Sequence, residues 1–77
     1  KRVCAVAGIG HPERFFDSLR GAGFQFDAKV FPDHHRYRVD DLSELKADII
    51  IMTEKDAVKC RQFQDQRCYF LKIAATL

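Results

Sequence analysis

The segment Asp48-Ile49-Ile50-Ile51-Met52-Thr53-Glu54-Lys55-Asp56 (residues 48–56) carries the strongest fold signal in the sequence. Its four consecutive large apolar residues predict a strand that is buried on both faces, as in the centre of a parallel sheet. Thr53 and Asp56 follow at capping-box spacing, which predicts a helix from Glu54 to about Gln62. A buried strand that leads directly into a capped helix indicates a parallel β-α-β unit.

The residues before this segment repeat the alternation of strand and helix. Residues 3–7 form a short apolar run that ends at Gly8-Ile9-Gly10. The sequence His11-Pro12-Glu13 then opens a helix, whose apolar residues recur at helical spacing until Gly21 and Gly23. Between residues 24 and 31, apolar and polar residues alternate, which predicts a half-buried strand of the kind found at a sheet edge.

Two further elements complete the predicted order. Asp40 or Asp41 can cap a brief helix that passes through Leu42 and Leu45, and residues 68–73 are predicted to form a last strand. The order is therefore β-α-β-α-β-α-β. We expect an α/β fold in which residues 1–77 form one small, three-layer, doubly wound domain with a mostly parallel four-stranded sheet.

Composition excludes several classes of protein. The formal net charge of +2 is scattered along the chain, without the basic stripe of a nucleic-acid-binding surface. The three cysteines lack Cys-x-x-Cys spacing, which favours reduced thiols over disulfides or zinc. The longest apolar run, residues 49–52, is far shorter than a membrane-spanning helix, and no signal peptide is recognisable. Because the chain starts without Met inside an apparent strand, we expect it to be a piece of a larger protein.

The chemically capable side chains follow three of the predicted strands. In a parallel α/β sheet, ligands bind outside the carboxyl ends of the strands. Three strand-to-helix junctions share that edge, namely residues 8–11, 32–35 and 53–56. The topology therefore predicts that most of the polar candidates gather on one rim.

The sequence Asp33-His34-His35 is the sharpest local feature of this rim. Histidine titrates near neutrality, and a neighbouring carboxylate can orient it as a general base. The competing interpretations are a solvated loop, or a histidine that caps the following helix. As metal ligands the two histidines are poorly placed, because neighbouring residues in an extended chain point in opposite directions.

The other two junctions carry weaker signals. Gly8-x-Gly10 lacks the third glycine of a dinucleotide-binding loop, so a tight turn that allows close packing of strand on helix explains it better. No Gly-Lys-[Ser/Thr] sequence is present, so these residues contain no P-loop. Lys55 lies in the first turn of its helix, where a positive charge opposes the helix dipole, and this conflict suggests a nearby anionic partner.

Three motifs together resemble the C-terminal domain of the tetraacyldisaccharide 4′-kinase family, the lipid A 4′-kinases. They are Ala7-Gly8-Ile9-Gly10-x-Pro12-x-Arg14-Phe15-Phe16, Phe31-Pro32-Asp33-His34-His35, and Met52-Thr53-Glu54-Lys55-Asp56-Ala57-Val58-Lys59-Cys60. The resemblance implies a parent enzyme that uses ATP and Mg²⁺ to phosphorylate the 4′-hydroxyl of tetraacyldisaccharide 1-phosphate, the lipid A precursor, at the cytosolic face of the bacterial inner membrane. It further implies that the P-loop and the membrane-binding helix lie in an N-terminal domain outside this chain.

The resemblance also implies roles for residues of the rim. It makes His34 the catalytic histidine, paired across the interdomain cleft with an aspartate of the N-terminal domain, with Asp33 beside it and His35 as the second choice. Supporting positions in the cleft fall to Lys55, Glu54 and Asp56. Lys55 is expected either to hold Asp33 or to face the cleft. We expect no metal site in the chain, no nucleic-acid partner, and no catalytic activity from the chain alone, which should itself be soluble.

Two other functions remain open at this point. One is a metal-dependent phosphoesterase of the Asp-His-His type, although such an enzyme needs further aspartates, and Asp17 and Asp27 fall in a predicted helix and strand. The other is a non-catalytic α/β module whose rim docks a partner domain.

Overall fold

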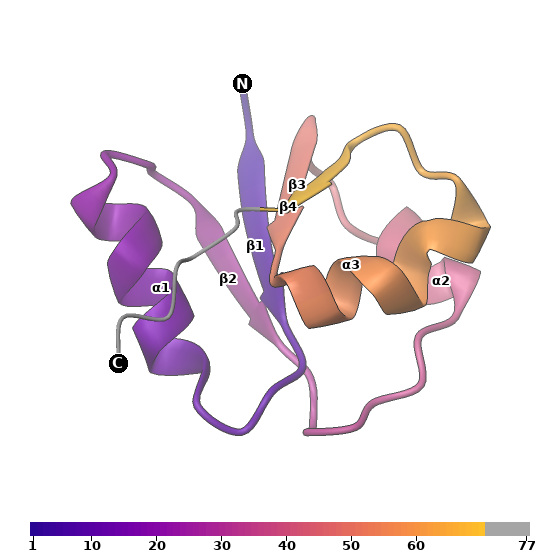
Figure 1. Cartoon of the computed structure of the whole chain (residues 1–77). Coiled ribbons are helices and arrows are strands. Elements are labelled where there is room, and N and C mark those ends of the chain that lie inside the picture. The colour runs from indigo at the N-terminus through magenta and orange to yellow at the C-terminus, as the bar shows by residue number, and fades with distance from the viewer. Residues whose placement is uncertain (71–77) are drawn as a thin grey trace.

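The structure is a computed structural model that describes residues 1–70 (Figure 1). Four strands and three α-helices alternate along this part of the chain, with one short 3₁₀ helix at residues 61–63. In order they are β1 (Val3–Ala7), α1 (Pro12–Gly21), β2 (Asp27–Val30), α2 (Val39–Ser43), β3 (Ile49–Met52), α3 (Glu54–Cys60) and β4 (Cys68–Phe70). The predicted alternation of strands and helices is confirmed.

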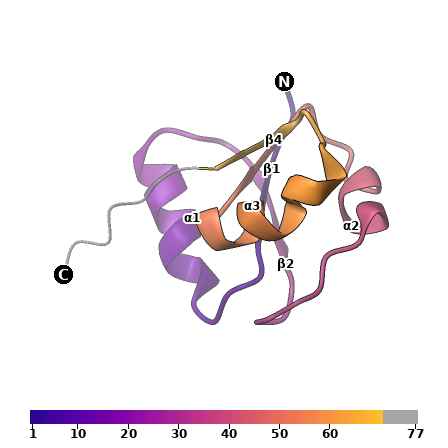
Figure 2. The same cartoon turned by 45° about the vertical axis from the view of Figure 1, so that its right-hand side comes forward.

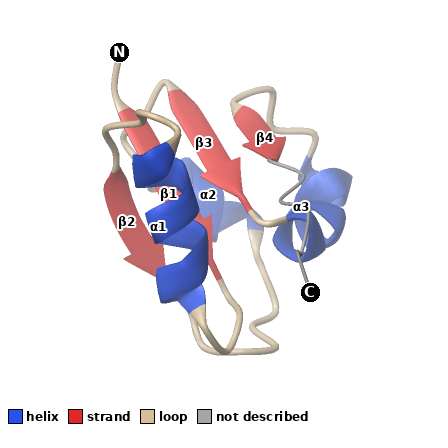
Figure 3. Ribbon diagram, turned by 60° about the vertical axis from the view of Figure 1, so that its left-hand side comes forward, coloured by secondary structure: helices blue, strands red, loops and turns tan. Residues whose placement is uncertain are grey.

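The strands form one sheet in the order β2-β1-β3-β4 (Figure 3). All three pairings in this sheet are parallel, so the expected α/β fold with a parallel four-stranded sheet is confirmed. The two central strands are also the most apolar. Residues 4–7 of β1 and residues 50–52 of β3 are buried, as expected for strands covered on both faces.

Helices cover both faces of the sheet, and alternate residues of the central strands contact different helices. On one face, Phe15, Phe16 and Leu19 of α1 pack against Ala5 and Ile51, in a cluster that also includes Ala7. On the other face, α2 and α3 pack against two residues of β1 and two of β3 in a second cluster (Figure 3). The side chains in this second cluster are Cys4, Val6, Tyr37, Leu42, Ile50, Met52 and Cys60.

Strand β2 differs from its prediction. The alternation over residues 24–31 predicts a half-buried strand, but the observed strand is shorter, and all four of its residues are exposed. The reason is its position, because β2 is an edge strand whose main contacts are with β1 alone. Only Phe26, just before the strand, keeps the predicted inward contact, with its ring centroid 5.8 Å from that of Phe16.

Three element boundaries also differ in detail from their predictions. Helix α3 ends at Cys60 rather than near Gln62, and a 3₁₀ turn replaces its last residues. Helix α2 has Arg38, not Asp40 or Asp41, at its N-cap, because the Asp41 carboxylate reaches back from the third helical position to the Arg38 N–H. Strand β4 begins at residue 68 as predicted, and residues 71–73 of the predicted strand lie outside the described part of the chain.

The carboxyl ends of β1, β2 and β3 lie at one edge of the sheet. The loops after β1 and β2 run side by side at the end of the molecule opposite the N-terminus (Figures 1 and 2). The carbonyl oxygen of Pro32 in the second loop would lie 3.5 Å from a Cβ atom placed on Gly8 in the first. The predicted rim therefore exists, and it brings together residues that are far apart in the sequence.

Candidate functional site

A buried carboxylate, that of Asp56, lies at the centre of the rim. Its side chain is fully buried, and it accepts hydrogen bonds from three groups. Its Oδ2 accepts from the Gly8 backbone N–H at 3.0 Å and from the Thr53 hydroxyl at 2.6 Å, and its Oδ1 accepts from the Tyr37 hydroxyl at 3.0 Å. Because all three partners are donors, the site suits an ionised carboxylate. The residue thus joins α3 to the loop after β1 and to the segment before α2.

Gly8 is required by the close approach of β1 to α3 and to Tyr37. A Cβ atom at Gly8 would lie 2.8 Å from the Tyr37 hydroxyl and 3.2 Å from Asp56 Oδ1. Asp56 belongs to α3, so the glycine allows the end of β1 to pack closely on a helix, as expected. The backbone also has to approach the buried carboxylate and phenol closely enough for the hydrogen bond to form.

Tyr37 is a functional-site residue that the sequence does not single out. It is 7% exposed, and burial followed by the nearby Asp56 charge raises the pKa of its phenol well above the usual range. The phenol therefore stays protonated and acts as a permanent donor to Asp56. The sequence does contain a local sign that Tyr37 is buried. It is the only residue with a largely apolar side chain in the otherwise charged run 33–38.

The two rim histidines occupy different environments. His34 has a left-handed backbone (φ 63°), and its side chain is 90% exposed. Its Nε2 lies 3.8 Å from Asp33 Oδ2, too far for a hydrogen bond but close enough for electrostatic stabilisation of an imidazolium. A left-handed non-glycine residue is uncommon and carries strain, which tends to occur at functional sites.

His35, in contrast, is a structural residue of the loop. Its ring stacks on Phe31 with the centroids 4.5 Å apart, and it meets the Tyr37 ring edge-on. Its Nε2 lies 3.0 Å from Asp41 Oδ2, and because a carboxylate only accepts, this ring nitrogen carries the hydrogen. The same carboxylate accepts from the Arg38 N–H, so His35 supports the start of α2. His35 does not itself cap α2, whose N-cap is Arg38, and it contacts the helix through the Asp41 carboxylate.

The remaining candidates lie in the first turn of α3. Glu54 and Lys55 are exposed, whereas Asp56 is buried beneath the rim. Within residues 1–70, no carboxylate lies within 4 Å of Lys55, so it does not hold Asp33 in this structure. Asp33 instead lies above the loop after β1, with its Oδ2 3.5 Å from the place of a Cβ atom at Gly10.

The cysteines lie apart from this rim chemistry. Burial raises the pKa of Cys60 to about 12 and that of Cys68 to about 11, and it also raises the pKa of Cys4. Protonated thiols are poor nucleophiles and poor metal ligands. Among the described residues, no three His, Cys, Asp or Glu side chains are grouped so that they could hold a metal ion.

The fold and the rim together define a small parallel α/β domain with its polar groups at the carboxyl ends of the strands. The family model for tetraacyldisaccharide-1-P 4'-kinase matches residues 1–77, the whole chain. The chain therefore belongs to this family, and the resemblance in the three motifs is confirmed. The matching family is not one of Asp-His-His phosphoesterases. No solved structure matches the chain.

Individual relatives agree with the family match. The chain is 49% identical over 77 residues to a tetraacyldisaccharide 4'-kinase of Methylobacillus flagellatus, and 52% identical over 77 residues to one of Xanthomonas campestris. It is 45% identical over 75 residues, 97% of the chain, to one of Legionella pneumophila. The first two matches cover 100% of the chain, yet the chain spans only 22–23% of the length of these relatives.

Within residues 1–70, no helix has the length and apolar character needed to cross a bilayer.

Proposed function

We propose that this chain is part of an ATP-dependent kinase that phosphorylates the 4′-hydroxyl of tetraacyldisaccharide 1-phosphate in lipid A biosynthesis. The proposal is supported by the family match over residues 1–77 and by the names of the relatives. The chain spans less than a quarter of those relatives. In this proposal it contributes one side of an active site whose other side belongs to the rest of the enzyme.

The observation that carries the proposed residue roles is the contrast between the two histidines. His35 is held by Phe31 and Asp41, so its ring serves the structure of the loop. His34 is free to meet a substrate, because its side chain is 90% exposed. In this proposal His34 pairs with an aspartate from the rest of the enzyme and takes up the proton of the sugar hydroxyl.

The chemistry of phosphoryl transfer suits this division of work. The reaction depends mainly on positioning and charge stabilisation, with one group needed to accept the hydroxyl proton. Asp33, 3.8 Å from His34 Nε2, stabilises the imidazolium that forms when His34 accepts that proton. Because the partner aspartate lies across a cleft, closure of the cleft assembles the pair and becomes part of catalysis.

The proposal assigns ATP and Mg²⁺ mainly to the rest of the enzyme. The described residues offer neither a grouped set of metal ligands nor a P-loop sequence. The proposed partners are the N-terminal P-loop domain and the lipid A precursor, and association with the cytosolic face of the inner membrane is proposed to occur through that other domain. In this proposal the isolated chain has no kinase activity, and Glu54 and Lys55 have supporting positions in the cleft.

The test is transfer of labelled γ-phosphate by the whole kinase, measured for the wild type and for His34→Ala, His35→Ala and His11→Ala. His11 is the matched control, because it is another exposed histidine on the rim, at the N-cap of α1. Loss of an acid–base group reduces kcat by roughly a hundredfold or more, and we expect this for His34→Ala alone.

Other outcomes are equally informative. A folded His34→Ala variant with normal kcat would show that the Asp33-His34 segment is scaffold. A loss confined to His35→Ala, with a normal melting temperature, would move the catalytic role to His35. Activity of the isolated chain would contradict the proposed division between the two domains.

A further inference from the structure

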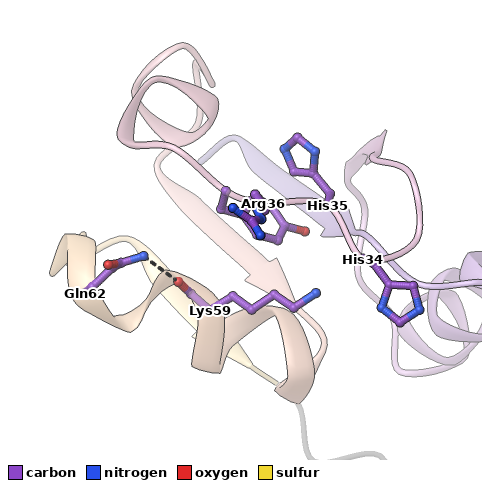
Figure 4. Close-up of a pocket in the computed structure, with 6 residues that line it drawn as sticks. His34, His35, Arg36, Lys59 and Gln62 are labelled. Atoms are coloured by element: carbon purple, nitrogen blue, oxygen red, sulfur yellow. Dashed lines mark hydrogen bonds between the residues drawn. The ribbon is translucent and has the colours of Figure 1, made fainter.

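A pocket of about 530 Å³ opens next to His34, between the segment 34–37 and the C-terminal half of α3 (Figure 4). The side chains that line it are His34, His35, Arg36, Tyr37, Lys59 and Gln62. The pocket is within the usual size range of small-molecule sites. The proton transfer proposed above gives no role to Arg36, Lys59 or Gln62.

The charge in this pocket is positive and uncompensated. Arg36 comes from the loop and Lys59 from α3, and both line the pocket (Figure 4). No carboxylate lines the pocket, and within residues 1–70 no carboxylate lies within 4 Å of either cation. Two cations facing a shared concave surface repel each other and attract an anion.

Three acids of the rim and of the segment next to the pocket, Asp33, Asp41 and Asp56, do not supply that anion. Asp40 neither lines the pocket nor pairs with a cation of residues 1–70. The Asp33 carboxylate lies 3.8 Å from His34, and the Asp41 carboxylate lies 3.0 Å from His35. The Asp56 carboxylate is buried behind the Tyr37 phenol, which donates to it. Each of these carboxylates therefore already has a partner, and the cations of the pocket remain available to a ligand.

The donor set favours a phosphate group. An arginine presents a planar fork of N–H donors that matches phosphate oxygens, and a lysine adds a compact point charge. The rings of Tyr37 and His35 add flat, partly apolar walls, which suit a sugar ring attached to that phosphate. A pocket of this volume is too large for a phosphate ion alone.

We propose that Arg36 and Lys59 bind the phosphate group of a phosphorylated sugar in this pocket. This proposal rests on the proposed function, since it deepens the account of the acceptor at the same rim. The phosphate has two possible sources in that reaction, the 1-phosphate of the disaccharide and the phosphates of the nucleotide. Both sources present the same chemistry to the pocket, and the experiment separates them.

The experiment uses the whole kinase with Arg36→Gln, Lys59→Gln and the double variant. The matched control is Lys46→Gln, which removes an exposed positive charge outside the pocket. KM is measured for tetraacyldisaccharide 1-phosphate, for the same disaccharide without its phosphate, and for ATP. Thermal unfolding of each variant checks that the fold is retained, which we expect because both cations are exposed.

If the 1-phosphate occupies the pocket, each single variant raises KM for the phosphorylated disaccharide by roughly tenfold or more, the size of a lost charge-assisted hydrogen bond. KM for the dephosphorylated disaccharide and kcat then stay near the wild-type values. A rise in KM for ATP instead assigns the pocket to the nucleotide. Arg36→Lys should recover only part of the loss, because it restores the charge without the planar fork.

Failure of this proposal can be distinguished from failure of the proposed function. The pocket binds no phosphate if the Arg36 and Lys59 variants keep KM for every substrate within about twofold of the values for the wild type and for Lys46→Gln. This conclusion does not depend on the effect of His34→Ala on kcat. If the whole kinase does not phosphorylate the disaccharide, the proposed function fails. The pocket is then tested with inorganic phosphate, whose ³¹P signal should broaden more with the wild type than with the double variant. Equal broadening with the two proteins would overturn the proposal that the pocket binds phosphate.

Discussion

The backbone N–H of Gly8 donates to the carboxylate of Asp56 at 3.0 Å, although 48 positions separate the two residues. The other oxygen of the same carboxylate accepts from Tyr37, three positions after His34. The loop that carries His34 is therefore anchored to the end of β1 and to the start of α3 by one buried side chain.

Substitution of Asp56 should be among the most destabilising single changes in the chain. Asp56→Ala leaves the Gly8 N–H and the Tyr37 hydroxyl without an acceptor, and each unpaired buried donor costs about 1–3 kcal/mol. We expect the urea midpoint of unfolding, followed by far-UV circular dichroism, to fall steeply. Asp56→Asn should be intermediate, because its amide retains one oxygen. The exposed Asp17→Asn is the control, and an unchanged midpoint for Asp56→Ala would contradict the anchoring role.

The close approach at Gly8 is tested by three glycine substitutions. Gly8→Ala forces the Tyr37 hydroxyl away from Asp56, because the new Cβ would lie 2.8 Å from it, and overpacking of this kind costs about 1–3 kcal/mol. Gly10→Ala should be milder, because its nearest neighbour is at 3.5 Å. Gly21→Ala, with nothing within 4 Å, should be neutral or stabilising by up to about 1 kcal/mol. The prediction fails if Gly8→Ala and Gly21→Ala have the same melting temperature.

The fold was predictable because its signals are local. Four apolar residues in β3 indicate a buried strand, and the capped helix that follows needs only nearby residues to be recognised. The parallel arrangement and the shared rim then follow from the alternation of elements. The edge position of β2 agrees with its period-two pattern, but its full exposure was not predictable, because the pattern of one strand does not show whether another element covers it.

The site was predictable only in part, since its contacts are distant in sequence. Capping-box spacing accounts for Asp56 locally, yet its carboxylate bonds to Gly8 and Tyr37 rather than to the Thr53 backbone N–H. The two histidines are adjacent and chemically identical, so sequence alone left the choice between them open. In the structure, only His35 reaches Asp41, and that contact depends on the path of the loop.

Relief of backbone strain should separate stability from activity at His34. Replacement by glycine removes the cost of a left-handed conformation, about 1 kcal/mol, so His34→Gly should raise the melting temperature while kinase activity falls. Gln64, the other left-handed non-glycine residue in the described part of the chain (φ 53°), is the control. Gln64→Gly should raise stability with activity unchanged. A His34→Gly variant that is less stable than the wild type would show that His34 makes stabilising contacts.

Arg67 should contribute strongly to stability, although the sequence gives no sign of it. Its guanidinium donates to the carbonyl oxygens of Leu42, Leu45 and Ala47 at 2.8–3.1 Å, and it pairs with Asp65 at 2.8 Å. Arg67→Gln leaves most of these carbonyls unpaired, and we expect a loss of about 2–3 kcal/mol in the free energy of unfolding.

Two variants separate the carbonyl contacts of Arg67 from its charge. Arg67→Lys should recover little of the stability, because an ammonium cannot span three carbonyls. Arg61→Gln, at an exposed arginine, is the control for loss of charge. Equal urea midpoints for Arg67→Lys and the wild type would show that the charge alone matters.

The stability of the chain should decrease in acid partly through Asp41. The Arg38 N–H, followed by His35, lowers the pKa of the Asp41 carboxyl from its usual value of 3.8. A carboxyl whose pKa is lower in the folded state adds stability above its unfolded pKa, because the unfolded state then binds more protons as the pH falls. That stability is complete above about pH 5 and is lost as the pH falls through 3.8 toward the lower folded value.

Asp41→Asn should therefore be less stable than the wild type at pH 6, and the difference should shrink as the pH is lowered to 3. The measurement is the urea midpoint at half-unit pH steps. Asp40→Asn is a closely matched control, because Asp40 is also in the first turn of α2 and its carboxylate accepts no hydrogen bond from the described residues. Parallel pH curves for the wild type and Asp41→Asn would contradict the prediction. The contact between Arg38 and Asp41 would then be absent in solution, and His35 would have lost the partner that distinguishes it from His34.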